Sequence, residues 1–275
     1  MIELPEAITF SKQLKETITG KTISKVVAAH TTHKLTWYYG DPEKYHDLLQ
    51  HRTIDGATAF GGFVEISAGT MKLLFNDGVN LRFFSNTSKK PDKHQLLVEF
   101  TDGSILCAFV QMYGGLGCFV EHTLDNKYYR VAKEKPSPVS KEFSETYFNT
   151  LFSSPDVQNL SIKAFLATEQ RIPGLGNGVL QDILYNAKIH PKQKVHAISE
   201  QQTSILYTSI KKTLQEMIDN NGRDTEKDLF SEKGRYRTRV SKNTVGKPCE
   251  VCGSRIEKST YLGGSIYYCS GCQTL

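Results

Sequence analysis

The chain has 275 residues, of which 39% are hydrophobic and 23% charged, a composition typical of a globular protein with one large or two modest domains. It has no run of about 18 apolar residues, which argues against a membrane-spanning helix. Its net charge of +5 allows a polyanionic partner without requiring one. The first residues, MIELPEAITF, lack the layout of a signal peptide, so we expect a cytoplasmic protein.

The first predicted element is a helix that begins in the sequence ELPE and ends at Gly20. Pro5 lies near the first helical position, where its missing N–H costs nothing. Glu3 and Glu6 place acidic side chains at the positive end of the helix dipole. That interaction alone would be a sufficient reason for both glutamates.

Strand-like patterns follow from Thr22 to about Val131, and they predict a β-sandwich or barrel over residues 1–132. Two Asp-Gly turns are predicted to form hairpins, because Asp-Gly tolerates the positive φ of a two-residue loop. The predicted strands and turns are Thr22–Ala29, Gly61–Gly69, Met71–Phe84 with its turn at Asn76–Gly78, His94–Val110 with its turn at Thr101–Gly103, and Gly117–His122.

A linker is predicted at residues 133–140, because two prolines and several charges interrupt both periodicities. Helical patterns then predict a domain over residues 141–235, with helices at Lys141–Leu151 and Ser199–Asn220 and a helix–turn–helix at Ser161–Ala187. In that turn, Asn177 stands where the N-cap of the second helix is expected. A glycine turn before a helix N-terminus is equally consistent with a phosphate-binding site and with a simple bend between two helices.

Residues 223–245 are rich in charge and are predicted to form a long loop followed by a strand. Arg235, Arg237 and Arg239 alternate, which would place three guanidinium groups on one face of that strand, for phosphate or for solvent. The basic run Lys89–Lys93 is predicted to be a solvated loop.

The C-terminal segment, residues 236–275, carries two Cys-x-x-Cys pairs, formed by Cys249, Cys252, Cys269 and Cys272. Four thiolates at this spacing predict a closed, tetrahedral, structural zinc site in a hairpin. Two disulfides are a much weaker alternative in a cytoplasmic chain. Cys107 and Cys118 lie in apolar strand patterns and are predicted to be core thiols.

In this order, the ELPE helix, the β-rich domain, the SIKAFL helix with its GLGN turn and the cysteine hairpin ending in CxxCQ resemble the formamidopyrimidine-DNA glycosylase / endonuclease VIII family over the whole chain. The resemblance implies an α+β fold: an N-terminal helix with a β-sandwich domain, then a helix–two-turn–helix domain and a zinc-finger hairpin. It implies a monomer that binds double-stranded DNA with a damaged base or an abasic site and flips the damaged nucleotide out. It also implies association with the nucleoid.

The resemblance assigns roles to individual positions. The family's nucleophile, an N-terminal proline, corresponds to Ile2, and Glu3 and Glu6 would open the sugar ring and position the nucleophile. The residues predicted to contact DNA are Lys163, Gly176, Asn177, Phe83, Gln111 and Tyr113, together with Arg237 of the alternating arginines.

Several of these positions depart from the family pattern. Proline is replaced by Ile2, an expected lysine by Gly62, and the arginine of the zinc hairpin by Gly264. Gln111 and Tyr113 replace an Arg and a Phe that in the family fill the void left in the DNA. Phe83 replaces a methionine that many members insert there as the third residue. Ile2 would supply an amine only if Met1 were removed. We therefore expect weak or absent Schiff-base lyase activity.

Two functions remain open. The first is a base-excision-repair glycosylase in which Glu3 or Glu6 activates a water molecule. The second is a non-catalytic protein that binds damaged or distorted DNA. A zinc-finger protein that acts on other proteins is disfavoured by Asn177 and by the basic charge balance. The lesion itself is not predicted.

Overall fold

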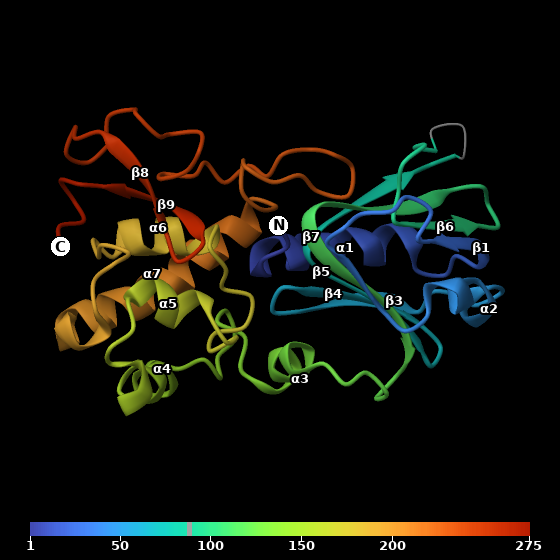
Figure 1. Cartoon of the computed structure of the whole chain (residues 1–275), viewed down its shortest axis with the longest axis horizontal. Coiled ribbons are helices and arrows are strands. Elements are labelled where there is room, and N and C mark those ends of the chain that lie inside the picture. The colour runs from blue at the N-terminus through green and yellow to red at the C-terminus, as the bar shows by residue number, and fades with distance from the viewer. Residues whose placement is uncertain (87–89) are drawn as a thin grey trace. The chain divides into compact units, whose positions relative to one another are not determined.

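The computed structural model describes residues 1–86 and 90–275, which divide into two compact units (Figure 1). The first unit comprises Met1–Arg130 and Glu226–Lys233, and the second comprises Val131–Thr225 and Gly234–Leu275. None of the helices in these ranges is long and apolar enough to cross a membrane.

The first unit begins with the predicted helix, α1 (Leu4–Ile18). Pro5 occupies its first turn, and Phe10, Leu14 and Ile18 recur on the face that is buried in the core. Gly20 follows the helix with a φ of +83°, a left-handed conformation that glycine adopts without steric cost. Helix α1 thereby fixes Glu3 and Glu6 at its N-terminal end.

One seven-stranded sheet forms the centre of the first unit, with strand order β1-β6-β7-β5-β4-β3. These neighbours pair antiparallel, whereas β2 lies off the path and pairs parallel with β7. A short helix, α2 (Tyr45–Leu49), follows β2, and α3 (Lys127–Glu134) follows β7. The strands are β1 (Ile23–Ala28), β2 (Thr36–Tyr39), β3 (Gly56–Phe60), β4 (Phe63–Ala68), β5 (Met71–Phe84), β6 (Leu96–Phe100) and β7 (Ile105–Val120).

One of the two predicted hairpin turns is wrong. Strand β5 runs without a break from Met71 to Phe84, and Asp77 lies in a bulge of this strand with a φ of +56°. The positive φ that Asp-Gly tolerates is therefore used for a bulge, which bends the strand without reversing it. The other turn, Thr101–Gly103, connects β6 to β7 as predicted, with Gly103 at a φ of +82°.

Glycines in β7 allow two neighbouring segments to approach it closely. A Cβ atom on Gly115 would lie 2.3 Å from Oδ1 of Asn76 in β5 and 3.0 Å from the ring of Tyr39 in β2. A Cβ atom on Gly117 would lie 3.0 Å from Cβ of Tyr39. Side chains at these two positions would push β2 away from β7.

The segment Glu226–Lys233 packs in the first unit, although sequence reasoning placed it in the helical domain 141–235. Leu229 is fully buried in the core that also contains Phe10 and Leu81. Its backbone N–H donates to Oε1 of Gln13, and its carbonyl accepts the N–H of Phe83, both at 3.0 Å. The segment is held by a buried side chain and by hydrogen bonds to α1 and β5.

The second unit is helical, with Ser144, Ser161 and Ser199 as N-caps of three of its helices. Four helices pack here: α4 (Glu145–Phe152), α5 (Ile162–Ala167), α6 (Val179–Asn186) and α7 (Glu200–Asp219). The N-cap of α6 is Gly178, so Asn177 lies one residue before the cap and the prediction that it caps the helix is wrong. Its side chain is free to bond elsewhere.

The C-terminal part of the second unit forms the predicted hairpin, β8 (Ile256–Tyr261) and β9 (Gly264–Cys269). The strand predicted near Arg235 is not formed, because this segment makes only an isolated bridge between Tyr236 and Arg223. The segment is nevertheless alternately exposed and buried, with Arg235, Arg237 and Arg239 exposed. The expectation that these three side chains share one face therefore agrees with their burial.

Candidate functional site

The N-terminus of the first unit is built around the amine of Met1. This amine forms an ion pair with Oε2 of Glu226 at 2.5 Å. The next nitrogen, that of Ile2, is a peptide N–H that donates to the carbonyl of Asp77 at 2.5 Å, and the Ile2 side chain is buried in the core. At the predicted nucleophile position there is therefore an amide with a hydrogen-bond partner.

Glu3 and Glu6 are 3% and 5% exposed, and both have interaction partners in the folded chain. Burial raises the pKa of Tyr113, and the charges of Asp77 and Glu3 raise it further. The Tyr113 hydroxyl lies 3.8 Å from Sδ of Met1. Three predicted site residues, Ile2, Glu3 and Tyr113, thus gather around Met1.

Asp77 joins this group and was missed by sequence reasoning. Burial raises the pKa of its carboxyl group, while a hydrogen bond from Nδ2 of Asn76 at 2.7 Å and the charge of the terminal amine partly oppose the shift. A non-glycine residue with positive φ, a perturbed pKa and a neighbouring amine is a candidate functional residue. The only sign of Asp77 in the sequence is the break in the apolar pattern at Asn76–Gly78, and the same break is also typical of a turn.

The other residues of the first unit that the resemblance singled out lie at three places. Phe83 packs partly buried against the core, and Gln111 is exposed on β7. Gly62 lies in the tight turn between β3 and β4. Among the described residues, no hydrogen bond or ion pair joins Phe83, Gln111 or Gly62 to the Met1 amine.

In the second unit, Asn177 connects the helical turn to the hairpin. Its Nδ2 donates to the carbonyl of Ser265 at 2.9 Å, and its Oδ1 is a buried atom that has no hydrogen-bond partner in residues 1–86 and 90–275. Gln181 reinforces the connection, because its Nε2 donates to the carbonyl of Asn177 and its Oε1 accepts the N–H of Tyr267. The turn that contains Gly176 and the tip of the hairpin therefore form one polar site.

Lys163 belongs to the same site. Its Nζ donates to the carbonyl of Tyr261 and lies 5.9 Å from the centre of the Tyr261 ring, and burial lowers the pKa of its ammonium group. A Cβ atom on Gly264 would lie 3.4 Å from this Nζ and 3.6 Å from Asn177. Where the resemblance implies an arginine on the hairpin, the structure has a glycine with the ammonium group of Lys163 beside it.

Arg237 lies on the exposed edge of the segment that leads to the hairpin. The carboxylate of Asp182 holds this segment by accepting the N–H groups of Arg239 and Val240, at 2.8 and 2.9 Å. Complete burial raises the pKa of Asp182 to about 6, although these hydrogen bonds partly oppose the shift. Arg239 is paired with Glu250, which leaves Arg235 and Arg237 as the exposed guanidinium groups of the run without an ion pair among the described residues.

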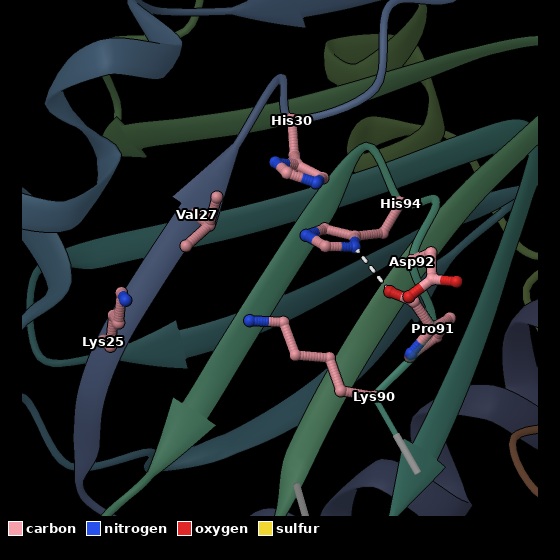
Figure 2. Close-up of a pocket in the computed structure, with 7 residues that line it drawn as sticks. All are labelled: Lys25, Val27, His30, Lys90, Pro91, Asp92 and His94. Carbon is pink, nitrogen blue, oxygen red and sulfur yellow. Dashed lines mark hydrogen bonds between the residues drawn. The ribbon is translucent and has the colours of Figure 1, made fainter. Parts of the chain in front are cut away.

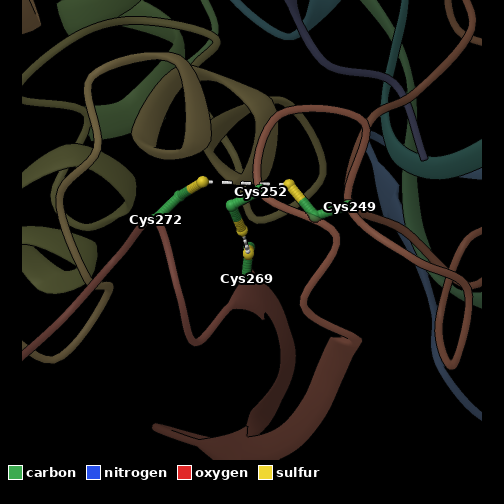
Figure 3. A group of neighbouring side chains, drawn as sticks. All are labelled: Cys249, Cys252, Cys269 and Cys272. Carbon is green, nitrogen blue, oxygen red and sulfur yellow. Dashed lines mark hydrogen bonds between the residues drawn. The ribbon is translucent and has the colours of Figure 1, made fainter.

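The four predicted cysteine ligands converge in space, as Figure 3 shows. Their Sγ atoms all lie within 4.8 Å of one another, and those of Cys249 and Cys272 are 3.8 Å apart. With Zn–S bonds of about 2.3 Å, the edge of a tetrahedron is about 3.8 Å, so the cluster fits a zinc ion. The Tyr185 hydroxyl lies 3.1 Å from Sγ of Cys249 and ties the cluster to α6.

A basic pocket in the first unit was not predicted (Figure 2). It has a volume of about 540 Å³, and His30 and His94 stack within it with ring centres 4.5 Å apart. Lys90 at its edge lies 3.6 Å from Glu99, which offsets part of the positive charge. Of the loop Lys89–Lys93, predicted to be solvated, Lys89 lies outside the described residues. The pocket is lined by Lys25, Val27, His30, Lys90, Pro91, Asp92 and His94, none of which is a predicted site residue.

Two domain models of one protein family match the chain in the order of these sites. Residues 1–113 match the formamidopyrimidine-DNA glycosylase N-terminal domain, and residues 135–228 match the formamidopyrimidine-DNA glycosylase H2TH domain. The chain belongs to the formamidopyrimidine-DNA glycosylase / endonuclease VIII family. The resemblance drawn from the sequence and the fold class inferred from it are confirmed.

Relatives and solved structures agree with this membership over the full length of the chain. Formamidopyrimidine-DNA glycosylases of Bacillus licheniformis and Bacillus subtilis are 28% and 26% identical, covering 99% and 100% of this chain and 99% of each relative. Lactococcus lactis Fpg in complex with Fapy-dG-containing DNA is 25% identical with a TM-score of 0.84, covering 99% of this chain and 100% of that one. The same protein with abasic-site DNA, at 24% identity and a TM-score of 0.84, supports the fold.

Proposed function

We propose that this protein is a base-excision-repair DNA glycosylase that binds duplex DNA, flips a damaged nucleotide out, and releases the base with weak or absent AP-lyase activity. The observation that carries the proposal is the group at the start of α1, where Glu3 is buried, its charge raises the pKa of Tyr113, and the Tyr113 hydroxyl lies 3.8 Å from Sδ of Met1. The family assignment supports DNA glycosylase chemistry, and the solved relatives contain DNA with lesions or abasic sites.

In the proposed reaction, the carboxylate of Glu3 or Glu6 removes a proton from a water molecule. The water oxygen then forms a bond with the sugar C1′ atom, the N-glycosidic bond breaks, and its electron pair leaves with the base, which takes up a proton. The product is an intact strand with an abasic site.

The weak lyase activity follows from the N-terminal geometry. A Schiff base needs a neutral amine that attacks C1′, but the nitrogen of Ile2 is an amide bonded to Asp77. The amine of Met1 is one residue away and is paired with Glu226. Because a displacement of about 1 Å can cost roughly 100-fold in rate, this amine is a poor replacement for the family's nucleophile.

The DNA-binding part of the proposal uses both units. Lys163, Asn177 and the backbone at Gly176 would hold phosphates near the flipped nucleotide, with Arg237 on a neighbouring phosphate. Gln111, Tyr113 and Phe83 would contact bases. Cys249, Cys252, Cys269 and Cys272 would hold zinc, and this closed site would stabilise the hairpin without taking part in the reaction.

Replacing Lys163 with Met is expected to weaken binding to all duplexes by a similar factor and to lower the slope of log K against log salt by about 1, since one phosphate contact is lost. The measurement is fluorescence anisotropy of labelled duplexes over a series of salt concentrations. Lys141→Met, at an exposed lysine of the second unit, serves as the control. An unchanged salt slope in a folded Lys163→Met protein would remove Lys163 from the phosphate site.

The proposed function is tested with duplexes that carry a panel of damaged bases, with and without hot alkali after incubation. Strand cleavage only after alkali is the expected result, because it reports base release without lyase activity. Covalent trapping with borohydride at a rate comparable to base release would overturn the water mechanism. Tight, salt-dependent binding without base release on any duplex would favour the alternative, a non-catalytic protein that binds damaged DNA.

A further inference from the structure

A small patch at the N-terminal site of the first unit is formed by the exposed side chains of Leu35 and Trp37 and the partly buried side chain of Tyr113. We call these three side chains the aromatic patch. Trp37 is the one tryptophan of the chain, and 51% of its surface is exposed, while Leu35 is 45% exposed. The rings of Trp37 and Tyr113 meet edge to face, with centres 6.3 Å apart.

The backbone holds this patch in place. Strand β2 pairs with β7 in register, Trp37 opposite Gly115, and the N–H of Gly114 donates to the carbonyl of Leu35 at 3.1 Å. The next residue of β2, Tyr38, packs against the core, so the alternation of the strand turns Trp37 outward. Because β7 has glycines where side chains would push β2 away, the pairing of these two strands fixes the position of Trp37.

The patch lies at the edge of the proposed catalytic group. Tyr113 connects them, since its ring contacts Trp37 and its hydroxyl contacts Sδ of Met1. Lys34, exposed next to Leu35 in the chain, supplies a positive charge beside the patch. An occupant of the patch would therefore be held within reach of a nucleotide bound at Glu3.

We infer that the aromatic patch binds a nucleobase of the damaged duplex, with Trp37 as the stacking residue. When a nucleotide leaves the helix, the faces of the bases around the gap lose their stacking partners, and an aromatic ring replaces them favourably. Three side chains are too few for a stable protein interface, which buries about 800 Å² on each partner. The inference rests on the proposed function and deepens it, because it adds Trp37 to the residues proposed to contact bases.

The test compares a duplex with a tetrahydrofuran abasic analogue and the intact duplex of the same sequence. Because Trp37 is the only tryptophan, the abasic duplex is expected to quench the intrinsic fluorescence more strongly than the intact duplex at equal saturation. Trp37→Leu is expected to weaken binding of the abasic duplex by about 5- to 100-fold, the range measured for loss of one stacked base. Its affinity for the intact duplex should change less than about twofold, and Trp37→Phe should retain most of the preference.

Tyr128→Leu is the matched control, since Tyr128 is an aromatic residue of α3 with 52% of its surface exposed. If folded Trp37→Leu protein lost affinity equally for both duplexes, or lost none, the inference would be overturned. Base excision by the wild-type protein would still support the proposed function in that case. Failure of the wild-type protein to bind either duplex would overturn both.

Discussion

Replacing Glu3 with Gln is expected to lower the rate of base release by about 10²- to 10⁴-fold, the usual contribution of a general base. The amide keeps the size and shape of the carboxylate but does not accept a proton from water. DNA affinity should change little, because Glu3 is 3% exposed at the start of α1 and carries no positive charge for phosphate. The measurement is single-turnover base release, with the dissociation constant measured in parallel.

Two further variants make the result specific. Glu16→Gln removes an exposed carboxylate from the same helix and should leave the rate unchanged. Glu6→Gln tests the second candidate base, and a larger loss there than in Glu3→Gln would move the water-activating role to Glu6. Full activity in both Glu3→Gln and Glu6→Gln would exclude the proposed mechanism.

Replacing Cys269 with Ser is expected to abolish stoichiometric zinc binding and to reduce DNA affinity by at least tenfold. Cys269 is completely buried at the end of β9, so loss of the metal removes the support of the whole hairpin. The hairpin places Ser265 against Asn177 and Tyr261 against Lys163, and both contacts depend on its fold. Metal content by mass spectrometry and DNA binding by anisotropy are the two measurements.

Cys107→Ala is the control for this prediction. Cys107 is a buried thiol of the first unit, and its burial in an apolar surrounding raises its pKa to about 12. This variant should keep one zinc per chain even if it is less stable. Wild-type protein without bound metal, or Cys269→Ser protein with a full complement, would contradict a zinc site at the four cysteines.

The features that the sequence predicted correctly are those that depend on residues close together in the chain. The two Cys-x-x-Cys pairs carry their geometry in their spacing, and the fold brings their Sγ atoms together as expected. Helix α1 and the turn at Thr101–Gly103 follow from proline, glycine and apolar periodicity over short windows. The family resemblance rested on motifs of this kind.

Contacts between distant residues were not predictable in the same way. Asn76–Gly78 reads as a turn in isolation, and only the pairing of both halves of β5 with β7 makes it a bulge. The approach of Lys163 to Gly264 joins a helix to a hairpin tip far along the chain. Trp37 was not recognised because an exposed tryptophan has no sequence pattern that distinguishes it from a buried one.

The position of Leu229 has a consequence for the order in which the chain folds during synthesis. All seven strands of the sheet are complete by residue 120, but one side chain of the core they enclose is made more than a hundred residues later. Burying a leucine contributes about 1.5–3 kcal/mol, a substantial part of a typical net stability of 5–15 kcal/mol. While residues 131–225 are being translated, the interior of the first unit therefore stays incomplete, and this unit reaches full stability only after the segment Glu226–Lys233 has been made.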